Sequence, residues 1–506
     1  MEPSTGKRGF LRNFVVRFLL FSLLIVGVRF AYVITIRGES CGIGDEFCFF
    51  SSSSFIDANN LVTAAGGGRA GVSSSVTLHP AAATTPEFQK RVMFYITVFQ
   101  DLIVDGFLST KSKALCVETP VGDDVYALKE IGVDDAVGIY KIPAKPLVVK
   151  GLGFRQPFED NTFDFVFSGG GGLDRSDRAA EFAAEVGRTL KPEGYFVVHT
   201  ASKDTYSFNS FIGLFNCCKF VHSRHIAGFD SVPEVHEIVM KKENDIKIKK
   251  RTDQIPSNKC FVPGYKQDLV QKAEPLIMKE PLKPWITLKK NIENVKYLPS
   301  MVDINFKQRY IYVDVGSRSY GSSIVSWFKK QYPKQNKTFD IYAVEADTHF
   351  HDQYKSKKGV TLLPYAAWVR NETLVFEINQ TPGDENVEQG RGMGRIQPVK
   401  SGGGIVGSVD EIQGFDFAEW LKNTVSEKDF VVMKMDIEGT EFDLIPRLIE
   451  TGAICLVDEV FLECHYNRWQ KCCPGVRSPK YQKTYGQCLD LFKSLRQRGV
   501  LVHQWW

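Results

Sequence analysis

Three carboxylates follow a run of apolar residues late in the chain. The stretch Val431–Ile445 reads VVMKMDIEGTEFDLI, so Asp436, Glu438 and Glu441 arrive directly after a pattern typical of a buried strand. Charge at the tip of a core strand is costly unless something there uses it. Carboxylates in such a position can accept hydrogen bonds from a ligand, take a proton from it or hold a divalent cation.

Acids also end three other strand-like segments in the same part of the chain. Asp314, Glu345 and Glu463 lie at or near the ends of short runs rich in β-branched and aromatic residues. The carboxyl ends of parallel strands meet at one edge of an open sheet, and ligands bind there. We therefore expect a rim of carboxylates, one for each of four strands, around a single crevice.

The segments that carry these acids alternate between strand and helix patterns. The alternation over residues 301–506 predicts an α/β domain with a parallel, doubly wound sheet. A similar alternation over residues 87–240 predicts a second sheet of the same kind, and the Lys- and Pro-rich residues 241–300 are predicted to link the two. The expected architecture is two tandem Rossmann-like sheets.

The order of the motifs resembles the FkbM family of S-adenosylmethionine-dependent methyltransferases. The chain reads VDVGSRSYG, AVEAD, MKMDIEGTEFDLI and LECH after four successive strands. The resemblance implies S-adenosyl-L-methionine as the cofactor. Asp314 would orient the first loop or meet the amino-acid part of the cofactor, and Gly316 would let the backbone pass close to it. Glu345 would accept hydrogen bonds from the ribose hydroxyls, and Ala366 would border the adenine.

Methyl transfer is an in-line displacement, so alignment supplies much of the rate, and a base is needed only where the acceptor atom carries a proton. The candidates for this catalytic role are Asp436, Glu438 and His465. A divalent cation between Asp436, Glu463 and His465 is an alternative, but nothing in the spacing demands one and we predict no metal. Glu441 is expected only to complement a helix dipole.

Two features depart from the family pattern. Tyr320 stands at the second glycine position of the first loop, and Gly321 follows one residue later. The glycine-rich segment 388–408 lacks the strand-before, helix-after context of a phosphate loop. It is either a mobile lid over the acceptor or a plain insertion, and the sequence leaves both open.

Residues 87–240 carry a second resemblance. The stretch FRQPFEDNTFDFVF and the later GRTLKPEGYFVVHT resemble the later half of a type-11 class I methyltransferase domain. The earlier half differs, because the loop VETPVGDDV offers Gly122 alone where a glycine-rich turn is expected, and Pro120 removes an N–H. Glu118 stands where an acid could end the first strand. We expect this domain to be degenerate, with a structural rather than a catalytic role.

The amino-terminal part has a different composition. Residues 1–17 are basic, residues 18–36 are apolar apart from Arg29, and residues 37–86 are rich in Ser, Gly and Ala. About 20 apolar residues span a bilayer, and basic flanks stay cytosolic. We predict a cytosolic tail, a transmembrane signal anchor and a flexible stem, with the remaining chain in the lumen. A buried helix, a cleaved signal peptide and the inverted topology are the alternatives.

Other signals agree with a lumenal location without requiring it. Three N-x-T sequons, at Asn336, Asn371 and Asn379, are predicted glycosylation sites. Several of the eleven cysteines crowd the C-terminal end, where we expect a disulfide of open connectivity. The net charge of +4, without an arginine-rich stripe or zinc-finger spacing, argues against a nucleic-acid partner.

The whole layout resembles a group of plant membrane-anchored proteins described as methyltransferases. This resemblance implies a single-pass type II membrane protein of the Golgi that methylates a glycan or another small polar acceptor. The main alternative is a non-catalytic pseudo-methyltransferase that serves as a binding or assembly module. A glycosyltransferase with the same layout is disfavoured, because no D-x-D motif ends a strand.

Overall fold

The computed structural model describes residues 85–202, 204–228, 234–244, 262–380, 391–397, 407–470 and 475–506. All of them belong to one compact unit, Val76–Trp506. The predicted tail and anchor, and nearly all of the stem, lie outside the described residues, as does most of the glycine-rich segment 388–408. Within the described ranges, no helix is both long and apolar enough to cross a bilayer.

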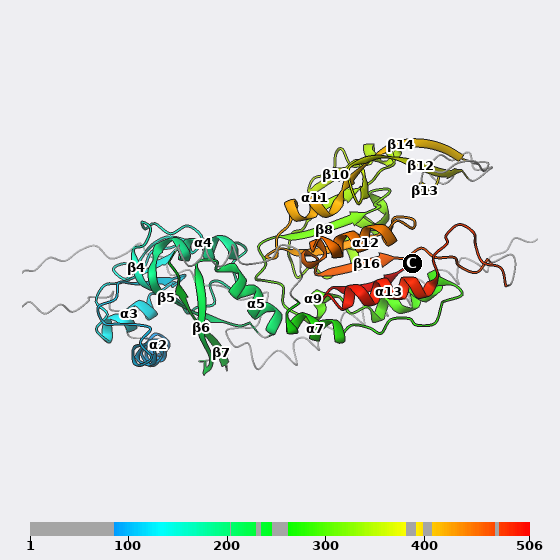
Figure 1. Ribbon diagram of the computed structural model, residues 1–506. Coiled ribbons are helices and arrows are strands. Elements are labelled where there is room, and N and C mark those ends of the chain that lie inside the picture. Colours follow the sequence, from blue (N-terminus) through cyan, green and yellow to red (C-terminus); the bar gives the residue numbers. More distant parts are fainter. Residues whose placement is uncertain are drawn as a thin grey trace, which may run out of the picture. The chain divides into compact units, whose positions relative to one another are not determined.

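The first α/β domain, coloured blue to green in Figure 1, contains a sheet in which strands β4 to β7 are labelled. The sheet has seven strands in the order β3-β2-β1-β4-β5-β7-β6. Its strands are β1 (Ala114–Val117), β2 (Ala136–Tyr140), β3 (Val148–Lys150), β4 (Phe163–Ser168), β5 (Leu190–Thr200), β6 (Cys218–Ala227) and β7 (Glu234–Lys242). Strands β1 to β5 are parallel, and β7 is antiparallel to both of its neighbours.

Apolar residues alternate between the two faces of this sheet, so each face has its own core. Helices α2 (Pro86–Val104) and α3 (Asp123–Glu130) cover one face, and α4 (Ala179–Thr189) and α5 (Thr205–Leu214) cover the other. Thr85 caps α2 by accepting a hydrogen bond from the backbone N–H of Phe88.

The second domain contains a six-stranded sheet in the order β10-β9-β8-β15-β16-β17, in which every pair is parallel. Its strands are β8 (Tyr310–Val315), β9 (Asp340–Val344), β10 (Val360–Leu363), β15 (Phe430–Met435), β16 (Glu459–Glu463) and β17 (Leu501–Trp505). All six residues of β15 are buried, as expected for a central strand covered on both faces. The strand order reverses between β8 and β15, which is where open α/β sheets bind ligands.

Helices again cover both faces of this sheet. One core includes α11 (Phe417–Thr424), α12 (Glu441–Glu450) and α13 (Tyr485–Arg496), and the other includes the π-helix η2 (Gly321–Lys329) and the 3-10 helix η3 (Thr348–Gln353). A disulfide joins Cys464, just after β16, to Cys488 in α13. This confirms the expectation of a disulfide near the C-terminal end.

Two features of the second domain differ from the sequence expectation. Helices α7 (Gly264–Gln271), α8 (Pro284–Asn291) and α9 (Leu298–Met301) occupy part of the predicted linker and contribute Leu269, Leu288 and Leu298 to the second domain's cores. The second domain therefore starts before residue 301. A separate four-stranded sheet of order β11-β14-β12-β13 is also present. Its strands are β11 (Ala366–Trp368), β12 (Glu372–Gln380), β13 (Arg391–Gln397) and β14 (Gly407–Asp416).

Candidate functional site

The loops that follow β8 and β15 come into direct contact at the reversal in strand order. The backbone N–H of Asp436 donates a hydrogen bond to the carbonyl of Val315 over 2.9 Å. Gly316 has a φ of 78°, and a Cβ placed on it would lie 1.9 Å from the carbonyl oxygen of Asp436. Only glycine fits this position, because any side chain would meet the neighbouring backbone.

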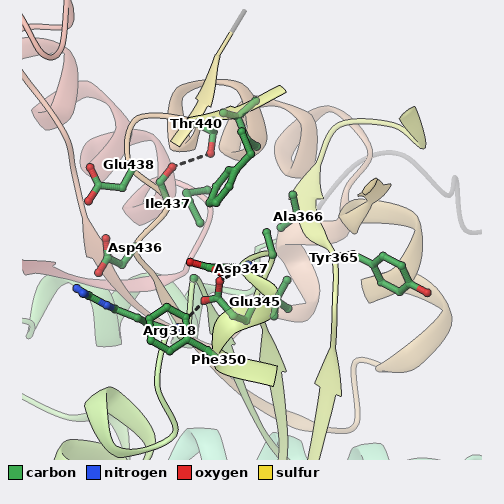
Figure 2. Close-up of a pocket in the computed structure, with 16 residues that line it drawn as sticks. Arg318, Glu345, Asp347, Phe350, Tyr365, Ala366, Asp436, Ile437, Glu438 and Thr440 are labelled. Atoms are coloured by element: carbon green, nitrogen blue, oxygen red, sulfur yellow. Dashed lines mark hydrogen bonds between the residues drawn. The ribbon is translucent and has the colours of Figure 1, made fainter. Parts of the chain in front are cut away.

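A cavity opens at this edge of the sheet (Figure 2). It is lined by Gly316, Arg318, Val344, Glu345, Ala346, Asp347, Phe350, Tyr365, Ala366, Ala367, Phe376, Ile396, Asp436, Ile437, Glu438 and Thr440. These residues come from the ends of β8, β9 and β15 and from the separate four-stranded sheet. Five of the predicted site residues are therefore brought together: Gly316, Glu345, Ala366, Asp436 and Glu438.

Asp314 does not line this cavity. Its side chain is fully buried, accepts a hydrogen bond from the Ser323 hydroxyl, and lies 3.8 Å from Lys434 Nζ. Of the two roles that the sequence left open for Asp314, this geometry fits the one of orienting the loop. Burial raises the pKa of Asp314, while the charge of Lys434 opposes that rise.

Glu345 directly follows β9 and is almost completely enclosed. Its Oε2 accepts a hydrogen bond from the backbone N–H of Arg318 and its Oε1 one from that of Asp347, both over 2.6 Å. Burial raises the pKa of Glu345 to about 7, although these two hydrogen bonds oppose the rise. The carboxylate is therefore held rigidly in the wall of the cavity, with lone pairs left to accept further hydrogen bonds.

Several charged side chains cluster around Asp436. Lys434 Nζ is 3.6 Å from one oxygen of Asp436, and His465 Nε2 is 3.6 Å from the other. His465 Nε2 also lies 3.9 Å from Glu438 and 3.9 Å from Glu463. Burial lowers the pKa of His465, but the charge and hydrogen bond of Glu441, together with the other acids, raise it to about 9. This pKa favours the protonated form of His465 at neutral pH, in which both ring nitrogens carry a hydrogen.

Glu441 does more than complement the dipole of α12. Its side chain is fully buried, and its Oε1 accepts a hydrogen bond from the backbone N–H of His465 over 2.6 Å and lies 3.3 Å from His465 Nδ1. Its Oε2 accepts a hydrogen bond from the backbone N–H of Gly439 over 2.9 Å. Glu441 thus fixes the turn before α12 and the orientation of His465.

Asp436, Glu463 and His465 each offer an atom within 4.8 Å of the others, which is spacing that a cation could use. The cluster already contains positive charge, however. Lys434 neighbours Asp436, and an Arg468 guanidinium nitrogen lies 3.7 Å from Glu463. Burial and the charge of Asp436 raise the pKa of Glu463 to about 7. Because these cations and the protonated His465 balance the carboxylates, we assign no metal ion to the cluster.

A second cavity adjoins the first and shares Ile396, Glu438 and Thr440 with it. It is lined in addition by Trp368, Arg370, Glu372, Thr373, Leu374, Val375, Gly439, Asp443, His465, Pro479, Lys480, Tyr481, Gln482 and Lys483. Glu438 accepts hydrogen bonds from Lys480 Nζ over 2.8 Å and from the Tyr481 hydroxyl. Its left-handed backbone (φ 51°) carries its side chain to the boundary of the two cavities.

At the corresponding edge of the first domain, the chain packs closely against itself. Glu118 Oε1 accepts a hydrogen bond from the backbone N–H of Gly153 over 2.6 Å. A Cβ on Gly172 would lie 2.5 Å from Glu118 Cβ, and a Cβ on Gly122 would lie 2.9 Å from Val148 Cγ2. The glycines here serve close packing within the chain, and the structural role expected for this domain stays a prediction.

Several lining residues were not singled out from the sequence. Arg318 could have been found, because it lies two residues after Gly316 in the first loop. Phe376 and Ile396 could not, because strands β12 and β13 place them in the cavity from far along the chain and no motif marks them.

Family models match both domains. Residues 133–198 match a model described as a methyltransferase domain, and residues 270–376 and 396–506 match one described as a domain of unknown function, DUF7870. No curated protein is significantly similar to the chain. The FkbM resemblance of the second domain stays a prediction.

Three of the solved structures similar to the chain each match about a third of it. One is an S-adenosylmethionine-dependent methyltransferase from Thermotoga maritima, which is 16% identical in sequence. The match covers 31% of this chain and 94% of that one, with a TM-score of 0.24. A Pyrococcus horikoshii protein has 15% identity, 32% and 93% coverage and a TM-score of 0.26. The N-methyltransferase NodS from Bradyrhizobium japonicum has 11% identity, 32% and 99% coverage and a TM-score of 0.24.

Part of the first α/β domain thus matches a methyltransferase domain model, and most of the second matches a model described as a domain of unknown function.

Proposed function

We propose that the second domain is an S-adenosylmethionine-dependent methyltransferase, with the cofactor in the first cavity and the acceptor in the second. The observation that carries this proposal is that the two cavities share Ile396, Glu438 and Thr440. Ligands in the two cavities would meet at these side chains, as a direct transfer between them requires.

The residues of the first cavity fit such a cofactor. The rigid Glu345 carboxylate at the end of β9 suits the two ribose hydroxyls. Tyr365, Ala366 and Phe376 offer an apolar wall for the adenine. S-adenosylmethionine would supply an electrophilic methyl group, and the chain would supply alignment and the exclusion of water.

The charge states of the groups around Asp436 indicate which of them could remove a proton from the acceptor. Because His465 is protonated at neutral pH, it would stabilise negative charge rather than accept a proton. Asp436 lines the first cavity and lies next to Glu463, whose pKa of about 7 suits a group that receives and releases a proton. Glu438 accepts hydrogen bonds from Lys480 and Tyr481, so it would shape the acceptor cavity rather than act as the base.

The remaining parts of the proposal concern location and acceptor. We propose a single-pass type II anchor at residues 18–36, a Golgi location with lumenal domains, and a glycan or other small polar acceptor. The mixed charges and the Trp368 ring of the second cavity support a polar acceptor that also offers an apolar face. Asn336 and Asn371 are exposed, as glycosylation would require.

The proposal is tested by calorimetric titration of S-adenosylhomocysteine, the demethylated cofactor product, into the purified full-length chain. We expect saturable binding to one site, and at least a 100-fold weaker affinity in Glu345→Ala, because a buried charged acceptor of hydrogen bonds is lost. Glu450→Ala, an exposed acid at the end of α12, serves as the control and should bind like the wild type. A folded wild-type chain that binds no cofactor would favour the pseudo-methyltransferase instead.

The affinity for S-adenosylhomocysteine should depend on pH. With its pKa raised to about 7, Glu345 is mostly protonated at pH 6 and mostly ionised at pH 8. Ribose hydroxyls donate to the ionised form, so the bound state lowers this pKa and affinity rises with pH, by about tenfold between those values. Titrations across this range check the slope, and Glu345→Gln should flatten it. A pH-independent wild-type affinity would contradict this assignment of the ribose to Glu345.

A further inference from the structure

Arg318 is distinctive among the residues that line the first cavity. The lining residues include four carboxylates, namely those of Glu345, Asp347, Asp436 and Glu438, and Arg318 is the one cationic side chain among them. Asp436 faces Lys434, and Glu438 accepts a hydrogen bond from Lys480, so two of these acids have cationic neighbours outside the lining. Among the described residues, the lining of the first cavity thus combines one cationic side chain with four acidic ones.

The backbone of Arg318 is held at both of its polar groups. Its N–H donates a hydrogen bond to Glu345 Oε2 over 2.6 Å, and its carbonyl accepts one from the Tyr354 hydroxyl over 2.9 Å. Its φ of 51° is left-handed, and its guanidinium lies 5.7 Å from the centre of the Phe350 ring. These constraints fix the direction in which the side chain leaves the turn.

The guanidinium lies on the same side of the cavity as Asp436 and Glu438, opposite Tyr365 and Ala366 (Figure 2). Glu345 lies between these two sides. A ligand whose ribose is held by Glu345 and whose base lies against Tyr365 must therefore extend its other end toward Arg318.

We propose that Arg318 binds the α-carboxylate of the cofactor and so fixes the direction in which the cofactor lies. This inference rests on the proposed function. An amino-acid end carries a carboxylate and an ammonium group, and here a guanidinium and the Asp436 carboxylate lie on the same side to receive them. In this direction the sulfur would lie between Glu345 and Arg318.

Two ligands separate this role from a general one in folding the cavity. S-adenosylhomocysteine has the amino-acid end, and methylthioadenosine has the same nucleoside and sulfur without it. In the full-length wild-type chain we expect S-adenosylhomocysteine to bind more tightly. Arg318→Gln should weaken S-adenosylhomocysteine by about 10- to 100-fold, the loss of one charge-assisted pair, and leave methylthioadenosine unchanged. Arg318→Lys should restore part of the loss.

Three outcomes would overturn this proposal. Equal weakening of both ligands in Arg318→Gln would give Arg318 a structural role, and weakening of neither would remove it from the cofactor site. Binding of neither ligand to the wild type would refute the proposed function together with this inference, and so is distinct from the other two. Lys355→Gln is the matched control, because Lys355 is exposed, pairs with Asp352 and lines neither cavity. It should change neither affinity.

Discussion

Replacing Gly316 by alanine should abolish cofactor binding and lower the free energy of unfolding by about 3 kcal/mol. The methyl group would lie 1.9 Å from the carbonyl oxygen of Asp436, and the backbone at φ 78° already disfavours a side chain. The loops after β8 and β15 would have to separate. Both Arg318, whose N–H binds Glu345, and the Asp436 side chain would then be displaced. Denaturant unfolding and S-adenosylhomocysteine titration measure the two effects.

Gly359→Ala provides a matched control for this result. Gly359 has a φ of 71°, but a Cβ on it would meet no atom within 4 Å. Its substitution therefore isolates the cost of left-handed backbone, about 1 kcal/mol, and should leave cofactor binding intact. If Gly316→Ala were no more harmful than Gly359→Ala, the contact between the two loops would not be what shapes the cavity.

The rim of acids could be predicted because it depends on local signals. Asp314, Glu345, Asp436 and Glu463 each lie at or next to the end of a strand, and parallel strands bring such ends to one edge. The structure agrees for all four strand ends. What the spacing could not give is which carboxylates reach the cavity, since Asp314 turns inward to Ser323 while Glu345 faces the cavity.

The parts that escaped prediction depend on contacts between distant segments. Glu441 was expected to act only on its own helix, yet it is buried against His465, which follows β16. The wall formed by Phe376 and Ile396 requires the pairing of β12 with β13, which alternating patterns alone do not specify. The helices between residues 264 and 301 have few apolar residues of their own and are held by the second domain's cores.

The match to a methyltransferase family and the open cavity occur in different domains. The matched residues 133–198 include β2, β3, β4 and most of β5, in the sheet at whose edge Glu118 and the neighbouring glycines pack closely. The cavities with convergent charges belong to the second domain. We therefore expect substitutions at Glu118 to affect stability rather than cofactor affinity.

Replacing Glu441 by glutamine should destabilise the second domain most strongly near neutral pH. In the wild type, His465 has a pKa of about 9 in the folded protein, against an ordinary value of 6.5. A raised pKa contributes stability that is fully present below about pH 6.5 and is lost as pH rises through 9. The difference between the two pKa values corresponds to roughly 3 kcal/mol of unfolding free energy. The variant removes the largest of the effects that raise this pKa, and leaves a buried imidazolium without its main partner.

The difference in unfolding free energy between wild type and Glu441→Gln should therefore be about 3 kcal/mol at pH 6 to 7 and should shrink as pH rises through 9. His503, whose pKa is also raised to about 9 by Glu274 and Glu459 against the effect of its burial, titrates in both proteins and cancels in the difference. Denaturant unfolding at several pH values measures the difference, and NMR titration of the His465 ring reports its pKa directly. Glu450→Gln, exposed at the other end of α12, should show no such trend. A difference that is independent of pH would mean that Glu441 acts through the turn at Gly439 alone, and not through the charge of His465.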